Sequence, residues 1–462
     1  MNASANRPFR VLIFALTNGQ RDRIVRAGDQ PGPRVGRWAV AQHVPLVPFG
    51  VDSGSQTEGR RDLSAPTSDC HMPGLELTVT RTQFAQEQRE FAAVVRDFCR
   101  RACGTKELRD RLTDGGRESH NPELYTRLAR AGLLGVSIPE QYGGSGGGLL
   151  DQALLFEELS YGLAPVHGAA PAHTVAGIYK HFGTEQQKKS ALSAICSGDV
   201  MSISVSEPEA GSDAAAVSCR AERDGQGYVI NGQKTWCSDA QFATHILLVA
   251  RTDRADNPHH GLTMFEIPTD AAGLSIRLID TMGSNEVNDL FFTDVVVPDS
   301  AVVGVVGKAW HQLMSGLNGE RLVAAAQALG MSRRTFDDLL EYVKTRKQFG
   351  QAIGTFQAVR HRIADMATEI EAARALLYDT ALRVDNRDGQ PAELTRLTSM
   401  TKLKLTETAK HVAIEGVQLM GGYGYSQEFE MQRHLRTSIP TTIYAGSSEI
   451  QREIISSTLG LR

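Results

Sequence analysis

The stretch from Ser202 to Asp239 constrains the fold more than any other part of this chain, because strand patterns and turn signals alternate within it. Ile203 and Val205 alternate with small hydroxyl residues, which is the period of a half-buried strand. The run Glu-Pro-Glu-Ala-Gly-Ser-Asp that follows predicts a turn. Asp224-Gly225 predicts a tight connection between two further strands. This part of the chain is therefore expected to be β structure.

Trp236 and Ser238 are expected on one face of the last of these strands, where an indole and a hydroxyl can lie against a flat polar ring such as a flavin. The stretch resembles the flavin-binding signature of the acyl-CoA dehydrogenase family, and the resemblance continues in order from about residue 80 to residue 462. It implies that Ser206, Trp236 and Ser238 contact the isoalloxazine of FAD, and that Ser212 contacts the pantetheine or thioester region of the substrate. The alternative is a surface hairpin whose Trp236 only packs.

Length and composition set broad limits. A chain of 462 residues exceeds one ordinary core, so two or three domains are expected. A net charge of −4 provides no positively charged surface that would attract nucleic acid. The sequence contains no run of 18 apolar residues, so no membrane span is predicted. The six cysteines lack zinc-type pairing or a secretory signal, which favours reduced thiols and a cytoplasmic location. No metal site is expected, since His259 and His260 are more typical of a polar loop.

Residues 1–78 differ from the rest in composition. They are rich in Arg, Gly, Pro and Ser, contain no Lys and show no sustained periodicity, so we expect a poorly structured extension there. The preferred explanation is a start codon upstream of the natural one, with Met72 as a candidate start. A targeting leader and a genuine disordered arm are the alternatives.

Residues 79–198 have a helical pattern and predict an N-terminal helical domain. Phe91, Val95 and Phe98 lie on one helical stripe. Asn121-Pro122 supplies an N-cap and a first-turn proline for a helix that ends near Gly132.

The remainder divides into a middle β domain at residues 199–305 and a C-terminal helical bundle at residues 306–462. Short strand patterns are expected at 244–250, 262–267, 274–279 and 290–297, and helices at 336–343, 363–382 and 403–420. The chain is thus predicted to be mainly α with a central β domain. The resemblance implies an N-terminal helical domain, a middle β-barrel domain and a C-terminal four-helix bundle.

Two segments of the C-terminal block, Thr345 to Gly350 and Gln418 to Gly424, resemble those that hold the dinucleotide part of FAD in this family, where they do so across a subunit interface. Arginine offers a planar fork to pyrophosphate, and paired glycines let backbone approach a ligand closely. Each segment alone also fits a solvated helix charge or a helix C-terminus. The cofactor contacts implied here are Arg346, Phe349, Gln357, Gln418, Gly421 and Gly422.

The catalytic glutamate of the family commonly lies in a Tyr-Glu-Gly-Thr run near the C-terminus, whereas this chain has Tyr444, Ala445, Gly446 and Ser447 there. Alanine cannot accept a proton. In isovaleryl-CoA and long-chain acyl-CoA dehydrogenases the base lies on a helix of the C-terminal block, and the resemblance places Glu320 at that site. Apolar residues follow Glu320, and their desolvation is expected to raise its pKa.

Two other interpretations of the carboxylates remain open. Glu320 can be a surface charge paired with Arg321 or Lys308. Glu449 is a rival base, although in the family this position faces FAD, so Ser447 and Glu449 are assigned to the cofactor. The resemblance further implies that the N–H of Ala445 polarises the thioester carbonyl, and that Gly446, Arg321 and Tyr444 border the substrate channel.

The predicted function is FAD-dependent oxidation of an acyl-CoA to its trans-2-enoyl-CoA, with electrons passed to an electron-transfer flavoprotein by a homotetramer, a dimer of dimers. One alternative is a dehydrogenase or oxidase of acyl or aminoacyl groups on a carrier protein. Another is a non-catalytic flavoprotein subunit of a mixed assembly, in which Ala445 marks lost activity.

Overall fold

The computed structural model describes residues 85–254 and 256–461, apart from the side chain of Ser315, and all of these residues belong to one packed unit. The extension predicted at residues 1–78 lies outside the described residues. Its structure and the proposed start at Met72 therefore stay predictions.

The N-terminal part is helical because its apolar stripes bury against one another. Phe91 and Val95 are buried in the main core, with Phe98 packed against it. The Asn121 side chain accepts a hydrogen bond from the Leu124 N–H at 2.8 Å, which confirms the predicted N-cap. The helices are α1 (Gln86–Cys103), α2 (Lys106–Leu112), α3 (Pro122–Arg130), α4 (Leu149–Tyr161), α5 (Ala169–Phe182) and α6 (Glu185–Ser197).

The middle part is a mixed β-sheet of eight strands with the neighbour order β6-β7-β3-β2-β4-β5-β8, and β1 pairs in parallel with β4. The strands β2 and β3 form the hairpin that Asp224-Gly225 predicts, with Asp224 opposite Gly227. The register of β3 against β7 shifts between Lys234 and Cys237, which marks a bulge. The strands are β1 (Val200–Ser204), β2 (Arg220–Asp224), β3 (Gly227–Ser238), β4 (Ala243–Arg251), β5 (Leu262–Pro268), β6 (Leu274–Leu278), β7 (Val287–Pro298) and β8 (Val302–Val303).

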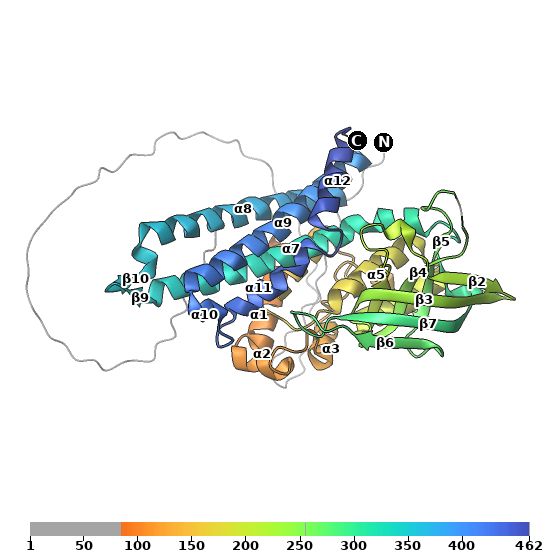
Figure 1. Cartoon of the computed structure of the whole chain (residues 1–462), viewed down its shortest axis with the longest axis horizontal. Helices are drawn as coiled ribbons and strands as arrows, with labels where there is room; N and C mark the ends of the chain where they lie inside the picture. The colour runs from red at the N-terminus through yellow and green to blue at the C-terminus, as the bar shows by residue number, and fades with distance from the viewer. Residues whose placement is uncertain (1–84, 255, 462) are drawn as a thin grey trace, which may run out of the picture. The chain divides into compact units, whose positions relative to one another are not determined.

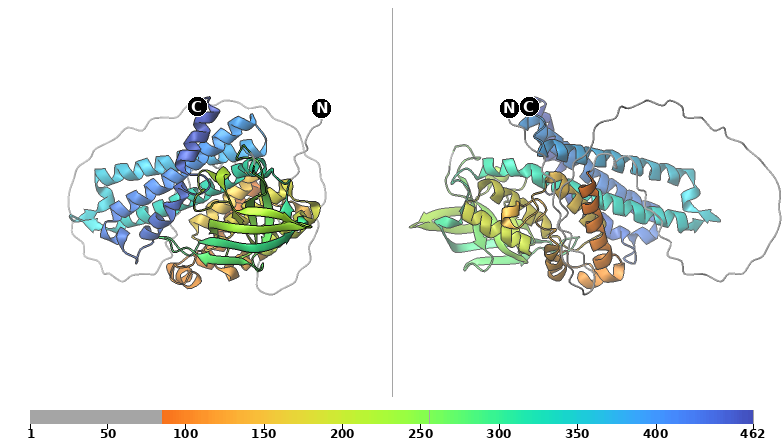
Figure 2. Two further views of the ribbon diagram at one scale, coloured as in Figure 1. Left: turned by 45° about the vertical axis from the view of Figure 1, so that its right-hand side comes forward. Right: turned by 180° about the vertical axis from the view of Figure 1, so that it is seen from behind.

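The C-terminal part contains three long helices that lie side by side, α7, α8 and α9, with the shorter α12 packed on α9 (Figures 1 and 2). Helix α4 also packs on α7, and α5 lies between α7 and β1, so the three parts share one core region. The remaining elements are α7 (Ala309–Thr345), β9 (Lys347–Gln348), β10 (Gln351–Ala352), α8 (Gln357–Asp385), α9 (Pro391–Met420), α10 (Gly422–Tyr425), α11 (Met431–Ser438) and α12 (Ser448–Thr458).

The predicted fold class, helices followed by β structure and then helices, is confirmed. The domain boundaries at residues 198/199 and 305/306 stay a prediction. Within the described part of the chain, no helix combines the length and the apolar character needed to cross a membrane.

Candidate active site

The three predicted flavin contacts lie at the ends of two neighbouring segments, β1 with its following loop and β3. The Thr235 N–H donates to the Ser206 carbonyl at 3.0 Å, and the Ser202 hydroxyl donates to the Ser238 carbonyl at 2.6 Å. At the bulge of β3, Trp236 has a positive φ of 60° and is 59% exposed. A large aromatic side chain held open in a left-handed conformation is typical of a ligand contact. Ser212 lies exposed in the loop between β1 and β2.

A charged pair lies directly beside Ser238. Asp239 is completely buried, and its Oδ2 lies 2.6 Å from Nδ1 of His167. Burial alone would lower the pKa of His167, but Asp239 and, more weakly, Glu286 raise it to about 9. The Asp239 N–H donates to the Glu286 carbonyl at 2.9 Å. His167 is therefore a cation at neutral pH at the edge of the predicted flavin site.

Glu320 lies on α7, and part of the residue is exposed although protein surrounds its carboxyl group. Burial raises the pKa of its carboxyl group, and the nearby charges of Arg321 and Lys402 oppose this shift only in part. The pairing with Arg321 or Lys308 is not found, since none of the ion pairs among the described residues includes Glu320. The Arg321 guanidinium instead donates to Asn318 at 3.0 Å. Among the described residues Glu320 therefore has no ion-pair partner, and the pKa of its carboxyl group lies above the ordinary value.

The loop around Ala445 presents two free backbone donors. Ala445 and Gly446 have positive φ values of 53° and 81°, and neither N–H has an acceptor among the described residues. The amide of the buried Gln451 donates to both of their carbonyls, at 3.1 and 3.0 Å. The carbonyl side of the loop is therefore fixed by protein, and the N–H side is available to a ligand.

The charges of Glu320, on α7, and of Glu286, next to β7, both act on Tyr444 of this loop. The pKa of Tyr444 is raised by desolvation of its phenol and by the carboxylates of Glu286 and Glu320, although 37% of the residue surface is exposed. Side chains from three distant parts of the chain thus converge here. Arg321, which is predicted to border the substrate channel, is almost completely buried: the residue is 6% exposed, and its Nε has no hydrogen-bond partner among the described residues.

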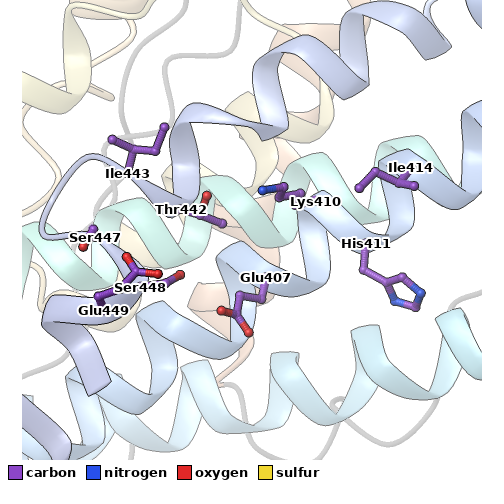
Figure 3. Close-up of a pocket in the computed structure, with 9 residues that line it drawn as sticks. All are labelled: Glu407, Lys410, His411, Ile414, Thr442, Ile443, Ser447, Ser448 and Glu449. Atoms are coloured by element: carbon purple, nitrogen blue, oxygen red, sulfur yellow. The ribbon is translucent and has the colours of Figure 1, made fainter. Parts of the chain in front are cut away.

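A groove of about 480 Å³ lies between α9 and the start of α12, close to this loop (Figure 3). Ser447 and Glu449, two of the predicted cofactor contacts, line one side, and Lys410 and His411 of α9 line the other. The pKa of Glu449 is lowered by hydrogen bonds from its own N–H and from the Ser447 hydroxyl. Glu449 therefore holds its proton less readily than Glu320, which makes it the poorer candidate base.

The other predicted cofactor residues lie at the far end of the long helices. The Arg346 guanidinium lies 5.1 Å from the ring centre of Tyr423, and Phe349 is 93% exposed with a positive φ of 51°. Arg346 directly follows α7 and lies 26 positions after Glu320, which along the helix is about 39 Å. Figure 1 shows the hairpin of β9 and β10 together with α10 at this end. Gln357, Gln418, Gly421 and Gly422 are also exposed there.

Within one chain, the residues predicted to contact cofactor and substrate therefore lie in two separate groups. The flavin-strand residues, Glu320 and the Ala445 loop form one group, and the Arg346 end forms the other. A single dinucleotide cannot contact both groups within the same chain.

No cluster of three potential metal ligands occurs among the described residues. His259 instead stacks on Trp310, with ring centres 4.4 Å apart. Three residues of the site, His167, Glu286 and Lys402, are not among those predicted from the sequence. Of these, only Lys402 is indicated by a sequence pattern, because it lies on the helical stripe of α9 whose other members are buried.

Three models of the acyl-CoA dehydrogenase family match the chain in order. The N-terminal domain model matches residues 85–199, the middle domain model 202–295 and the C-terminal domain model 307–460.

Curated relatives match most of the chain. It is 34% identical to the probable acyl-CoA dehydrogenase YngJ of Bacillus subtilis, over 82% of this chain and 99% of that protein. It is 32% identical to the caffeyl-CoA reductase-Etf complex subunit CarC of Acetobacterium woodii, over 81% and 99%. Identity to the mitochondrial isovaleryl-CoA dehydrogenase of Solanum tuberosum is 36%, over 73% and 82%.

Solved structures also match most of the chain. The acyl-CoA dehydrogenase from Geobacillus kaustophilus has a TM-score of 0.76 and 31% identity, over 82% of this chain and 99% of that one. The prolyl acyl carrier protein oxidase AnaB has a TM-score of 0.73 and 29% identity, over 82% and 100%. The chain belongs to the acyl-CoA dehydrogenase family.

Proposed function

We propose that this chain is an FAD-dependent acyl-CoA dehydrogenase in which Glu320 removes the α-proton of the acyl thioester. Two observations carry the proposal: the desolvated carboxylate of Glu320, whose charge acts on Tyr444 and Lys402 at the Ala445 loop, and the free N–H groups of Ala445 and Gly446 in that loop. A base and an electrophilic pocket in one place suit the removal of a proton next to a carbonyl.

Glu320 acts as the base because water competes poorly for a desolvated carboxylate. Its raised pKa brings its proton affinity closer to that of a general base working near neutral pH. The proton passes from the α-carbon to Glu320, and the electron pair of that C–H bond becomes the new α,β double bond. The β-hydrogen leaves with its own electron pair.

The N–H groups of Ala445 and Gly446 bind the thioester carbonyl oxygen. They lower the energy of the negative charge that develops on this oxygen as the α-proton leaves. Replacing the usual glutamate by Ala445 leaves this donor in place, since the donor is backbone.

The residues fit FAD. The open indole of Trp236 offers a face for stacking, and Ser206 and Ser238 lie beside it. When bound, FAD supplies the acceptor for the β-hydrogen and its electron pair. The groove lined by Ser447 and Glu449 would receive the rest of the dinucleotide.

Completion of this site would require a second subunit, whose Arg346 end would supply the distant contacts. We therefore propose a homotetramer built as a dimer of dimers. The electron acceptor we propose is an electron-transfer flavoprotein, because the relative CarC is a subunit of a complex with one. A cytoplasmic location fits the free state of the cysteines in the described part, Cys99, Cys103, Cys196, Cys219 and Cys237.

The test is an anaerobic stopped-flow measurement of flavin reduction by a panel of acyl-CoAs. Glu320→Gln should retain FAD and bind acyl-CoA, while the reduction rate falls by roughly 10²–10⁴. Glu449→Gln tests the rival carboxylate: it should bind FAD more weakly, and with FAD supplied in excess it should reduce its flavin at a rate close to that of the wild type. Unchanged reduction in Glu320→Gln would rule out this base.

The similarity to AnaB favours one second candidate, oxidation of an acyl or aminoacyl group on a carrier protein. The same flavin assay separates the two candidates when each acyl group is presented both on CoA and on a carrier protein. The proposed function predicts faster reduction by the CoA thioesters.

A further inference from the structure

Lys402 is a completely buried lysine on α9 that faces the Ala445 loop. Its ammonium donates to the carbonyls of Thr441 and Gly446, each at 2.9 Å. It also lies 6.0 Å from the centre of the Tyr444 ring. One cation thus ties both ends of the short segment that carries Tyr444 and Ala445.

The segment needs this support because its backbone is strained. Ala445 has a positive φ, and this conformation is unfavourable for any residue that has a Cβ atom. Gly446 also has a positive φ, and a Cβ there would lie 2.6 Å from the Gln451 amide nitrogen. Such conformations persist only where the surroundings hold them. Lys402 and Gln451 both donate to the Gly446 carbonyl, so the loop is held by α9 and by α12.

An apolar side chain of equal length would not replace Lys402, because it would remove a donor from the buried Thr441 carbonyl and one of two donors from the Gly446 carbonyl. The charge of Glu320 also acts on Lys402. Burial lowers the pKa of Lys402 to about 8, and the charge of Glu320 opposes part of this shift. The lysine therefore connects the base and the loop, although it is closed off from solvent and from a ligand.

We propose that Lys402 is a positioning residue that aims the N–H groups of Ala445 and Gly446 at the thioester carbonyl. The proposal rests on the proposed function, since it requires a thioester in this site. Lys402 acts through the backbone of the loop and takes no proton from the substrate. Its loss should weaken polarisation of the carbonyl without removing the base.

The experiment compares the FAD-loaded full chain with its Lys402→Met variant. The probe is crotonyl-CoA labelled with ¹³C at the carbonyl, and the readout is the infrared carbonyl stretch of the bound thioester. In the wild type the stretch should move to lower frequency on binding. In Lys402→Met at least half of this shift should disappear, and flavin reduction by butyryl-CoA should slow by about 10²-fold, the usual cost of losing an oxyanion donor.

Lys404→Met is the matched control. Lys404 lies two positions further along α9, 42% of its side chain is exposed, and its ammonium is 3.7 Å from Glu369. This variant should keep the full shift. Glu320→Gln should also keep the shift while losing reduction, so that failure of the base assignment and failure of the Lys402 assignment give different results.

A wild-type carbonyl shift in Lys402→Met would overturn the proposal. Lys402→Gln, which restores a shorter donor, should recover part of the shift and serves as the second variant. Loss of FAD or of the native circular dichroism spectrum in both variants would make Lys402 a residue of the fold and would also overturn the proposal. No shift in the wild type would remove the proposed function and this inference with it.

Discussion

Lys234 and Glu207 form an ion pair in the interior, with 2.8 Å between Nζ and Oε1 and both side chains almost completely buried. Lys234 also donates to the Val205 carbonyl at 2.7 Å, and the Glu207 carboxylate accepts the N–H groups of Ser218 and Cys219. The pair therefore fixes the backbone on both sides of Ser206, a predicted flavin contact. Lys234 supports the backbone around Ser206 as Lys402 supports the Ala445 loop.

Lys234→Met should destabilise the protein strongly, because it leaves the Glu207 carboxylate buried without its partner. Breaking a buried pair in this way costs about 3–5 kcal/mol. The free energy of unfolding in urea, measured on the FAD-free protein, checks this. Arg223→Met breaks the exposed pair with Asp299 instead and should have a far smaller effect. Equal effects of the two changes would contradict the structural role of Lys234.

His167 and Asp239 predict a loss of stability at alkaline pH. The pKa of His167 is about 9 in the folded protein against 6.5 ordinarily, so the folded state binds this proton more tightly. The contribution is complete below pH 6.5 and disappears as the pH rises through 9. The difference between the two pKa values corresponds to a contribution of at most about 3 kcal/mol to the free energy of unfolding.

The measurement is urea unfolding of the wild type and of His167→Gln between pH 6 and pH 9. The wild type should lose more stability than the variant across this range, with the two approaching each other near pH 9. His245→Gln, at a partly exposed histidine of β4, should follow the wild type. A constant difference between wild type and His167→Gln at every pH would count against the charged pair.

The fold could be predicted largely from local signals. The cap at Asn121 and the turn at Asp224-Gly225 each act over a few residues, and both lie where the sequence predicts them. The bulge at Trp236 could not be predicted, because it depends on the register of β3 against β7 and not on β3 alone.

The candidate site was predictable only where a motif marks it. Glu320 and Ala445 follow from the family resemblance. The pair of His167 and Asp239 joins residues 72 positions apart, and neither residue type at that spacing indicates the other. Lys402 carries only a weak sequence signal, because a single lysine in a helix usually lies in solvent even where the stripe it shares is otherwise buried. Its two partners are carbonyls, which are present at every position and leave no trace in a sequence.

A site shared between subunits predicts complementation. Glu320→Gln and Arg346→Met should each be inactive when prepared alone. In a hybrid dimer, one of the two sites receives Glu320 from one chain and Arg346 from the other, so it is intact. Mixing equal amounts under dissociating conditions and reassembling them should restore about a quarter of the wild-type sites.

Flavin reduction by acyl-CoA counts these sites, and each variant reassembled with itself is the control. If both groups of residues served one site within a single chain, every site in the mixture would contain one of the two inactivating substitutions. The mixture would then be as inactive as the separate variants. Size-exclusion chromatography should also find FAD only in dimers or larger assemblies.

Moving the carboxylate to residue 445 tests whether that residue and Glu320 face the same substrate carbon. Ala445 already adopts a positive φ with a Cβ atom present, so a glutamate there adds little backbone strain. In the Glu320→Gln background the new side chain meets no competing carboxylate from α7, and Lys402 beside the Gly446 carbonyl offers it a cation.

Glu320→Gln with Ala445→Glu should therefore reduce its flavin at least about tenfold faster than Glu320→Gln alone, a fraction of what a general base supplies. Glu320→Gln with Ala445→Gln is the matched control, because it fills the same volume without a base, and it should stay slow. Stopped-flow reduction at saturating acyl-CoA gives the comparison. Equal rates in the two double variants would mean that residue 445 does not reach the α-carbon.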